Sequence, residues 1–254
     1  MINPSEMANI ARAEESLWWF RGMREISFAL LDRLAAGRSG GCSGACRVLE
    51  AGCGTGYFAA ALERRYGSKV VAVDLESEAM QYCRQRGAPH PTQASIAALP
   101  FRNAAFDLVV SMDVLPHFAP GEEEAPFAEL VRVLRPQGLL MLRVAALRVF
   151  RSRHSEYVWE RQRFTRRRLA ELAGAHNLRI LHLTYANFLL SPVAFLKFRV
   201  YEPLARRPPA SGIQPMPAVL DRLLYLPLAL ERRWISRGWS FPWGQSLFLL
   251  AQKP

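Results

Sequence analysis

The residues best suited to chemistry form a glycine-rich turn directly after a short apolar run that ends at Glu50. Gly52, Gly54 and Gly56 stand in this turn, and Asp74 closes the next apolar run. Glycines allow a ligand to touch main chain where the first strand of a parallel sheet ends. A carboxylate at the end of the second strand suits the two hydroxyls of a ribose. The spacing therefore predicts a nucleoside-binding site.

The position of the third glycine distinguishes between two kinds of nucleoside. The dinucleotide-binding pattern is G-x-G-x-x-G, which places a pyrophosphate at a helix N-terminus. In this chain Tyr57 occupies the sixth position of that pattern, and the third glycine comes one residue earlier. The carboxylate of Glu50 would repel a pyrophosphate but would attract an ammonium or sulfonium group. A nucleoside without phosphate is therefore favoured, with a nicotinamide dinucleotide as the alternative.

The run from Glu50 to Gly56 resembles motif I of the class I S-adenosylmethionine-dependent methyltransferases. The motif is specific to that superfamily, and the resemblance implies S-adenosyl-L-methionine as the cofactor. It also implies which residues bind the cofactor. Those near its methionine end are Glu50, Gly52, Cys53, Gly54 and Gly56, and those near its ribose are Asp74 and Leu75.

Two later segments are similar to the parts of that family that follow the third and fourth strands. Ser95 and Ile96 take the place of residues that contact the adenine, and a hydroxyl accepts a hydrogen bond more weakly than the acidic residue usual there. Met112 and Asp113 are implied to border the cofactor. His117 is implied to stand near the methyl group, where a neutral imidazole could accept a proton from an oxygen or nitrogen nucleophile. The alternative is that His117 only shapes the pocket.

A second candidate catalytic residue is His154. The fragment around it is similar to one in a bacterial subgroup of the family whose N-terminus carries paired tryptophans, as Trp18 and Trp19 do here. An acidic residue often follows the histidine in that subgroup, whereas Ser155 follows it in this chain. The tryptophans are interpreted either as a lid over the substrate or as packed side chains.

Arginines crowd the segment 161–168, where cations in the first turn of a predicted helix oppose the helix dipole. Two arrangements are predicted: the arginines hold a phosphate or carboxylate of the acceptor, or they pair with nearby acids on a solvated surface. The arginines are Arg161, Arg163, Arg166, Arg167 and Arg168, and the acids are Glu156, Glu160 and Glu171.

The hydrophobic pattern predicts strands that alternate with helices, which implies a doubly wound parallel sheet of the α/β class. Strands are predicted at 47–50, 70–74, 92–96, 106–112, 138–144 and 178–185, and helices at 23–36, 57–66, 77–86, 121–135 and 166–175. A last strand is predicted at 246–251. The resemblance implies a Rossmann-like, seven-stranded sheet whose last strand is antiparallel.

Four parts are predicted along the chain. Residues 1–46 form an N-terminal helical segment and linker, and 47–185 form the cofactor-binding core. Residues 186–245 form an apolar insertion between strands six and seven, with helical stretches at 188–205 and 217–236. Residues 246–254 carry the final strand of the core.

Composition limits the partners and the compartment. The 254 residues carry a net charge of +11, which predicts an anionic partner. None of the four cysteines forms a C-x-x-C pair, so no metal site is predicted. No signal peptide or membrane span is predicted, because the longest uncharged run, Ile180 to Leu196, is short and interrupted. The expected location is the cytoplasm, with peripheral contact at the anionic inner face of the membrane as a further hypothesis.

The resulting prediction is an S-adenosylmethionine-dependent methyltransferase that acts on a small-molecule, glycan or lipid-linked acceptor, with oxygen as the favoured nucleophile. The apolar insertion supports a lipid-linked acceptor. Two alternatives are an RNA methyltransferase, which only the net charge favours, and a methyltransferase-like scaffold without catalysis. A nucleic-acid partner is not favoured, because no nucleic-acid module is recognised. The acceptor and the oligomeric state stay open.

Overall fold

The computed structural model describes residues 3–36, 46–206 and 208–254, so most of the predicted linker, at 37–45, lies outside the described residues. The chain folds around one seven-stranded sheet in the order β3-β2-β1-β4-β5-β7-β6. The strands are β1 (Arg47–Ala51), β2 (Lys69–Asp74), β3 (Pro91–Gln93), β4 (Phe106–Met112), β5 (Leu134–Ala145), β6 (Arg179–Ala186) and β7 (Ser246–Gln252). Strands β1 to β5 pair in parallel, and β7 runs antiparallel to both β5 and β6. The predicted fold class is confirmed.

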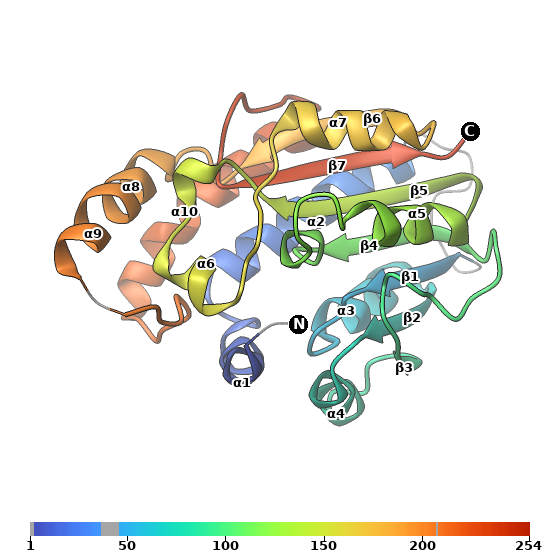
Figure 1. Ribbon diagram of the computed structural model, residues 1–254, viewed down its shortest axis with the longest axis horizontal. Helices are drawn as coiled ribbons and strands as arrows, with labels where there is room; N and C mark the ends of the chain where they lie inside the picture. The colour runs from blue at the N-terminus through green and yellow to red at the C-terminus, as the bar shows by residue number, and fades with distance from the viewer. Residues whose placement is uncertain (1–2, 37–45, 207) are drawn as a thin grey trace.

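Helices cover both faces of this sheet, since its central strands are apolar on both sides. In Figure 1, α5 and α7 lie in front of β4, β5 and β7, whereas α2 passes behind them. The helices next to the sheet are α2 (Trp18–Ala36), α3 (Tyr57–Tyr66), α4 (Ser77–Gln85), α5 (Glu124–Val133) and α7 (Arg166–Ala175). The strand order reverses between β1 and β4, and ligands of open parallel sheets bind at this switch, outside the carboxyl ends of the strands.

Three predicted boundaries in the core differ clearly from the structure. The helix predicted at 121–135 spans only 124–133, because the side chains of Glu122 and Glu123 cap the preceding turn by accepting the N–H groups of Ala119 and Gly121. The strand predicted at 92–96 ends at Gln93, and the strand predicted at 138–144 begins earlier, at Leu134.

The N-terminal part contains more helix than the apolar pattern predicts. Helix α2 begins at Trp18 rather than at residue 23, and α1 (Pro4–Ala13) precedes it. The side chain of Asn3 caps α1 by accepting the N–H of Ser5, and a proline in the first turn suits that helix start. A short helix, α6 (Arg153–Tyr157), was also not predicted, although Ser152 and Ser155 form a capping box at its start.

The insertion between β6 and β7 is helical, as predicted. It contains α8 (Ser191–Leu196), the π-helical turn η3 (Lys197–Tyr201), α9 (Glu202–Ala205) and α10 (Ala218–Ser236). Pro203 has no N–H to bond the carbonyl four residues earlier, which accounts for the widened turn. These helices occupy the end of the molecule toward which β4 and β5 point (Figure 1). Within the described residues, no helix combines the length and apolar character that a bilayer crossing requires. The domain boundaries remain a prediction.

Glu231 links helix α10 of the insertion to the chain that directly follows β6. Its fully buried carboxylate accepts the N–H of Asn187 at 2.6 Å and that of Leu189 at 2.9 Å. Burial raises the pKa of Glu231 from its ordinary 4.5 to about 7, and these backbone bonds offset only part of the effect.

This shift predicts a pH dependence of folding. The folded state binds the Glu231 proton more tightly than the unfolded state, so the stabilisation is complete below pH 4.5 and is lost as the pH rises through 7. We expect Glu231 to lower the free energy of unfolding by roughly 2–4 kcal/mol between those limits. Urea unfolding at several pH values, compared between the parent and Glu231→Gln, measures this contribution. Identical pH slopes in the two proteins would contradict it.

Candidate functional site

The glycine-rich turn after β1 is held against the end of β2 by main-chain hydrogen bonds. The N–H groups of Gly52 and Cys53 both donate to the carbonyl of Val73, at 2.7 and 2.8 Å. Gly52 has a φ of +84° and Gly54 a φ of +53°, in the left-handed region that favours glycine. A Cβ at Gly54 would have no atom within 4 Å, so open space lies beside the main chain there. A ligand can therefore contact the bare backbone at Gly54.

The carboxylate of Asp74 borders the same space. Its Oδ2 accepts the N–H of Gly54 at 2.8 Å, and its Oδ1 accepts the N–H of Glu76 at 3.1 Å. Each carboxylate oxygen can accept a second hydrogen bond, so both remain able to bind a hydroxyl. The backbone thus orients Asp74 as a receptor for a diol.

A cavity of about 790 Å³ joins the predicted site residues. Its volume lies within the usual range for ligand sites of about 300–1,000 Å³. The predicted residues that line it are Glu50, Gly52, Cys53, Gly54, Asp74, Leu75, Ser95, Ile96, Met112, Asp113, His117 and His154. Gly56 does not line it. A Cβ at Gly56 would stand 2.7 Å from Sγ of Cys83 on α4, so close helix packing requires this glycine.

Glu50 is the most deeply buried acid among these residues, with 3% of its surface exposed. Its Oε2 has no hydrogen-bond partner among the described residues. Burial raises the pKa of the Glu50 carboxyl well above its ordinary range, and the nearby Cys83, Glu14 and Asp74 add to the effect. A buried carboxyl oxygen without a partner is costly, and a cationic ligand group would satisfy it. The site is therefore suited to a cation.

The residues that follow β3 and β4 also line the cavity. Oγ of Ser95 accepts the N–H of Ala97 at 3.2 Å, which leaves the hydroxyl hydrogen of Ser95 available as a donor. The carboxylate of Asp113 pairs with Arg143 at 2.7 Å, and that guanidinium lies 4.9 Å from the ring centre of Trp19. An ion pair thus neutralises Asp113 at the cavity wall.

His117 lies in a 3-10 turn, η1 (Leu115–His117), directly after β4. Its Nδ1 is buried without a hydrogen-bond partner among the described residues. Burial lowers the pKa of His117, and the opposing effects of Asp113, Glu160 and a hydrogen bond to the Trp159 backbone are smaller. The imidazole is therefore neutral at neutral pH, with a nitrogen lone pair able to accept a proton.

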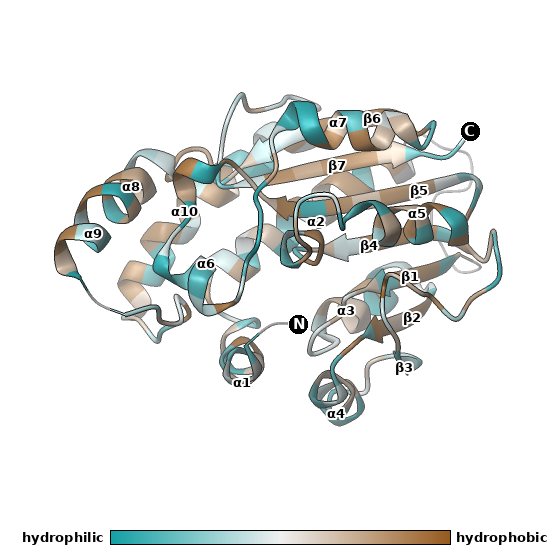
Figure 2. Cartoon of the chain, in the orientation of Figure 1, coloured by the Kyte–Doolittle hydropathy of each residue, from teal (hydrophilic) through white to brown (hydrophobic). Residues whose placement is uncertain are grey.

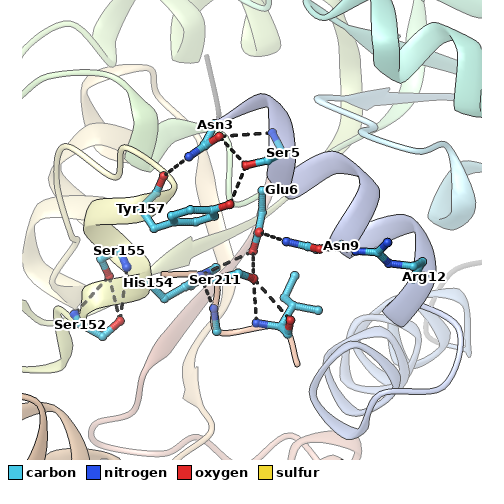
Figure 3. Close-up of polar contacts among 12 residues, drawn as sticks. Asn3, Ser5, Glu6, Asn9, Arg12, Ser152, His154, Ser155, Tyr157 and Ser211 are labelled. Carbon is cyan, nitrogen blue, oxygen red and sulfur yellow. Dashed lines mark hydrogen bonds and ion pairs between the residues drawn. The ribbon is translucent and has the colours of Figure 1, made fainter. Parts of the chain in front are cut away.

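His154 enters the cavity from α6. Its Nδ1 accepts the N–H of Gly212 at 2.9 Å, and Oε1 of the buried Glu6 lies 3.6 Å from the same nitrogen (Figure 3). Because Nδ1 accepts a hydrogen bond, the hydrogen of the neutral ring is placed on Nε2. Burial also lowers the pKa of His154. In this arrangement Nε2 of His154 is a hydrogen-bond donor, and the catalytic role of His154 remains a prediction.

Several charged residues of the cavity wall were not predicted from the sequence, among them Glu6, Glu14 and Lys197. Glu6 of α1 is 1% exposed and accepts hydrogen bonds from Ser211 and Asn9. Glu14 accepts a hydrogen bond from Thr55 in the glycine-rich turn. Lys197 lines the cavity from η3 and makes no ion pair within the described part of the chain. The sequence contained one signal for Glu6 and Glu14: Asn3 followed by Pro4 is typical of a helix start, and α1 brings this region to the cavity.

Both interpretations of the paired tryptophans fit the structure. Trp18 and Trp19 begin α2, line the cavity and pack against the core with part of their surface. Asp221 of α10 accepts the N–H of Trp18 at 2.7 Å, so the insertion helps to hold this wall. Their role as a lid stays a prediction.

Four of the five arginines pair with acids, as in the second predicted arrangement, although within the described residues the predicted Glu156 is not one of the partners. The pairs with Glu160 and Glu171 were predicted, whereas two further partners, Glu122 and Glu123, come from the region of α5. The remaining arginine, Arg166, donates to the carbonyl of Leu183 at 2.7 Å. Carboxylates thus pair four of the five charges, and these contacts give no support to a phosphate site at this cluster.

Comparison with known proteins agrees with this geometry. Residues 49–142 match the methyltransferase domain family. The chain is 36% identical over 130 residues to a probable S-adenosylmethionine-dependent methyltransferase of Mycobacterium tuberculosis, with 49% of this chain and 42% of that protein covered. It is 38% identical over 118 residues to a malonyl-[acyl-carrier protein] O-methyltransferase of Enterobacter lignolyticus, with 46% of this chain and 43% of that protein covered. The chain thus spans less than half the length of these relatives.

Solved structures share the fold at low identity. A geranyl diphosphate C-methyltransferase from Streptomyces coelicolor aligns with a TM-score of 0.56 at 15% identity, covering 87% of this chain and 77% of that one. The [4+2]-cyclase SpnF aligns with a TM-score of 0.54 at 20% identity, covering 89% and 80%. Such likeness establishes fold rather than chemistry. Over residues 49–142 the chain is therefore similar to the methyltransferase domain family, which agrees with the class I S-adenosylmethionine-dependent type that the sequence resembles.

Proposed function

We propose that this chain is a methyltransferase that uses S-adenosyl-L-methionine. The observation that carries the proposal is a single cavity that brings together the open main chain at Gly54, the carboxylate of Asp74 and the unpartnered oxygen of Glu50. The open main chain at Gly54 allows the cofactor to approach closely. The carboxylate of Asp74 suits its ribose diol, and the oxygen of Glu50 suits its cationic amino acid end.

The chain's own residues have separate tasks in this proposal. Asp74 accepts hydrogen bonds from the two ribose hydroxyls, and Glu50 pairs with the cationic end of the cofactor. Ser95 and Ile96 line the cavity and are the proposed contacts of the adenine, and Met112 and Asp113, at the end of β4, are the proposed neighbours of the cofactor there. When bound, the cofactor supplies a methyl group already activated on a sulfonium sulfur. The main contribution left to the protein is therefore to hold the acceptor in line with that group.

The proposed acceptor is a small-molecule, glycan or lipid-linked compound that presents an oxygen. The malonyl-[acyl-carrier protein] O-methyltransferases among the relatives are named for transfer to oxygen. His117 is the proposed base, because its neutral imidazole has an unpartnered Nδ1 that can accept the proton of a hydroxyl. A base of this kind contributes about 10²–10⁴-fold to the rate.

The proposal predicts saturable binding of the cofactor at one site per chain. Isothermal titration calorimetry of the unaltered protein with S-adenosylmethionine and S-adenosylhomocysteine should give a stoichiometry near one for both. Titration with NADH, followed by its fluorescence, should give no saturable change, because the turn favours a ligand without pyrophosphate. Binding of NADH in place of the methionine nucleosides would overturn the assignment. Absence of binding to any of the three would favour the scaffold alternative.

A further inference from the structure

Helices α8 to α10 expose an unusually large amount of apolar surface. On α10, Val219, Leu223, Leu226, Leu230 and Trp234 recur every three or four residues, so they lie along one side of the helix. These five side chains are 43–73% exposed. Figure 2 shows apolar residues along α8 to α10 at the end of the molecule that the insertion forms.

The run from α8 to α9 adds a second apolar stripe. Val193, Leu196, Val200 and Leu204 are 63, 60, 46 and 78% exposed. Their spacing of three or four residues again places them along one side of the nearly continuous helical run. We define these four residues and the five of α10 as the apolar face. Exposed apolar residues scattered singly are ordinary, but two such stripes within one insertion indicate a binding surface.

Helix α10 packs against the rest of the protein with a different side from the one that carries the apolar stripe. Leu228, Glu231 and Ile235 are fully buried. A Cβ at Gly22 of α2 would stand 2.3 Å from Cδ1 of Leu228, which shows how closely these helices approach. The apolar stripe of α10 is offset from these buried residues around the helix, so folding of this chain leaves it in contact with water.

The charges around this face have one sign. In the described part of 188–245, the exposed charged side chains are all cationic: Lys197, Arg199, Arg206, Arg222, Arg233 and Arg237. The carboxylates of the segment are used internally. Glu202 accepts the N–H of Arg153, Asp221 accepts that of Trp18, and Glu231 is buried. An apolar surface with a cationic border is complementary to anionic lipid.

We infer that the apolar face docks on an anionic phospholipid bilayer, with α8 to α10 lying in the plane of its surface. Trp234 and Trp239 are 43 and 49% exposed at the end of α10, and tryptophan is favoured at the boundary between headgroups and acyl chains. A second copy of this chain is a poorer occupant, because pairing two such faces would bring like charges together, and the described part of 188–245 has no exposed carboxylate to offset them.

This surface adjoins the cavity. Lys197, Phe198 and Tyr201 line the cavity, and they belong to the same helical run that carries Val193, Leu196 and Val200 of the apolar face. One helical layer therefore separates the docked surface from the site. Together with the proposed function, on which this step rests, the arrangement assigns the acceptor to the lipid-linked class, delivered from the bilayer beside α8 and α9.

Vesicle co-sedimentation of the full chain tests the docking directly. We expect binding to vesicles that contain phosphatidylglycerol, weak binding to pure phosphatidylcholine vesicles, and a fall in binding at high salt. The double variant Leu223→Glu with Leu230→Glu should lower the partition coefficient by about tenfold or more, because it places charge in the apolar stripe. Ile180→Glu is the matched control, since Ile180 is 38% exposed on the edge strand β6 outside this face. It should bind vesicles as the parent does.

Two further measurements keep the result interpretable. Arg222→Gln with Arg233→Gln leaves the apolar stripe intact and should reduce both the preference for anionic lipid and the salt dependence. Calorimetry with S-adenosylmethionine checks that each variant is folded. If the unaltered protein did not bind S-adenosylmethionine, the proposed function would be overturned, but the docking proposal would stand. Equal sedimentation with both lipids, or no effect of the leucine substitutions, would overturn the docking. So would a dimer, detected by light scattering, that the leucine substitutions convert to a monomer.

Discussion

Replacement of Asp74 by alanine is expected to weaken S-adenosylmethionine binding by about 10²–10³-fold. The carboxylate is proposed to accept hydrogen bonds from both ribose hydroxyls, and hydrogen bonds to a charged group are worth about 1.5–3 kcal/mol each. A loss of about 3–4 kcal/mol corresponds to that range of affinity. The substitution also removes the acceptor for the Gly54 N–H, which leaves the turn less well oriented. Calorimetry measures the change in dissociation constant.

Two matched variants separate this effect from a general loss of structure. Asp74→Asn keeps one acceptor oxygen and should fall between the parent and Asp74→Ala in affinity. Asp32→Ala removes a carboxylate that pairs with Arg65 on the surface, so it should leave cofactor binding unchanged. Circular dichroism should show that all three variants are folded at the temperature of the titration. Affinity of Asp74→Ala within about threefold of the parent would remove the ribose assignment.

The second large effect is expected from Gly52→Ala, which should lower the free energy of unfolding by about 2–5 kcal/mol. A φ of +84° costs a residue with a Cβ about 1–2 kcal/mol. The new Cβ would also stand 2.1 Å from Cγ2 of Val114, and such overpacking costs about 1–3 kcal/mol more. Thermal and urea unfolding measure the loss. Val114→Ala added to Gly52→Ala should recover the part that comes from the clash.

Gly54→Ala is the matched comparison, because it shares the left-handed backbone but has open space beside it. A Cβ at Gly54 meets no atom within 4 Å, so only the conformational cost of about 1–2 kcal/mol should appear in unfolding. The added methyl group would instead occupy space proposed for the cofactor, so affinity for S-adenosylmethionine should fall. Gly52→Ala should thus mainly affect stability and Gly54→Ala mainly binding. Equal stability losses in the two variants would contradict this account of the turn.

Local pattern was sufficient for the elements and for the turn that defines the cofactor site. The alternation of apolar runs with amphipathic segments predicted the sheet, and α3 and β4 have the predicted bounds. Two of the errors occurred where a side chain took over a backbone hydrogen bond. Glu122 and Glu123 cap a turn instead of starting a helix, and Ser95 accepts the N–H of Ala97. Such choices depend on which partner comes within reach, and residue type alone does not specify that.

What the sequence by itself determined is the chemistry that residues close along the chain can perform: a glycine turn after one strand, a carboxylate after the next, and an apolar insertion before the last. What only the tertiary structure decided is which distant groups complete or cancel that chemistry. Folding brings Glu6 of α1 to 3.6 Å from His154 and pairs Arg168 with Glu123 across the fold. It also buries Glu50 and Glu231, which raises both pKa values. Burial and ion pairing depend on distances in space, so residues far apart in the chain decide them together.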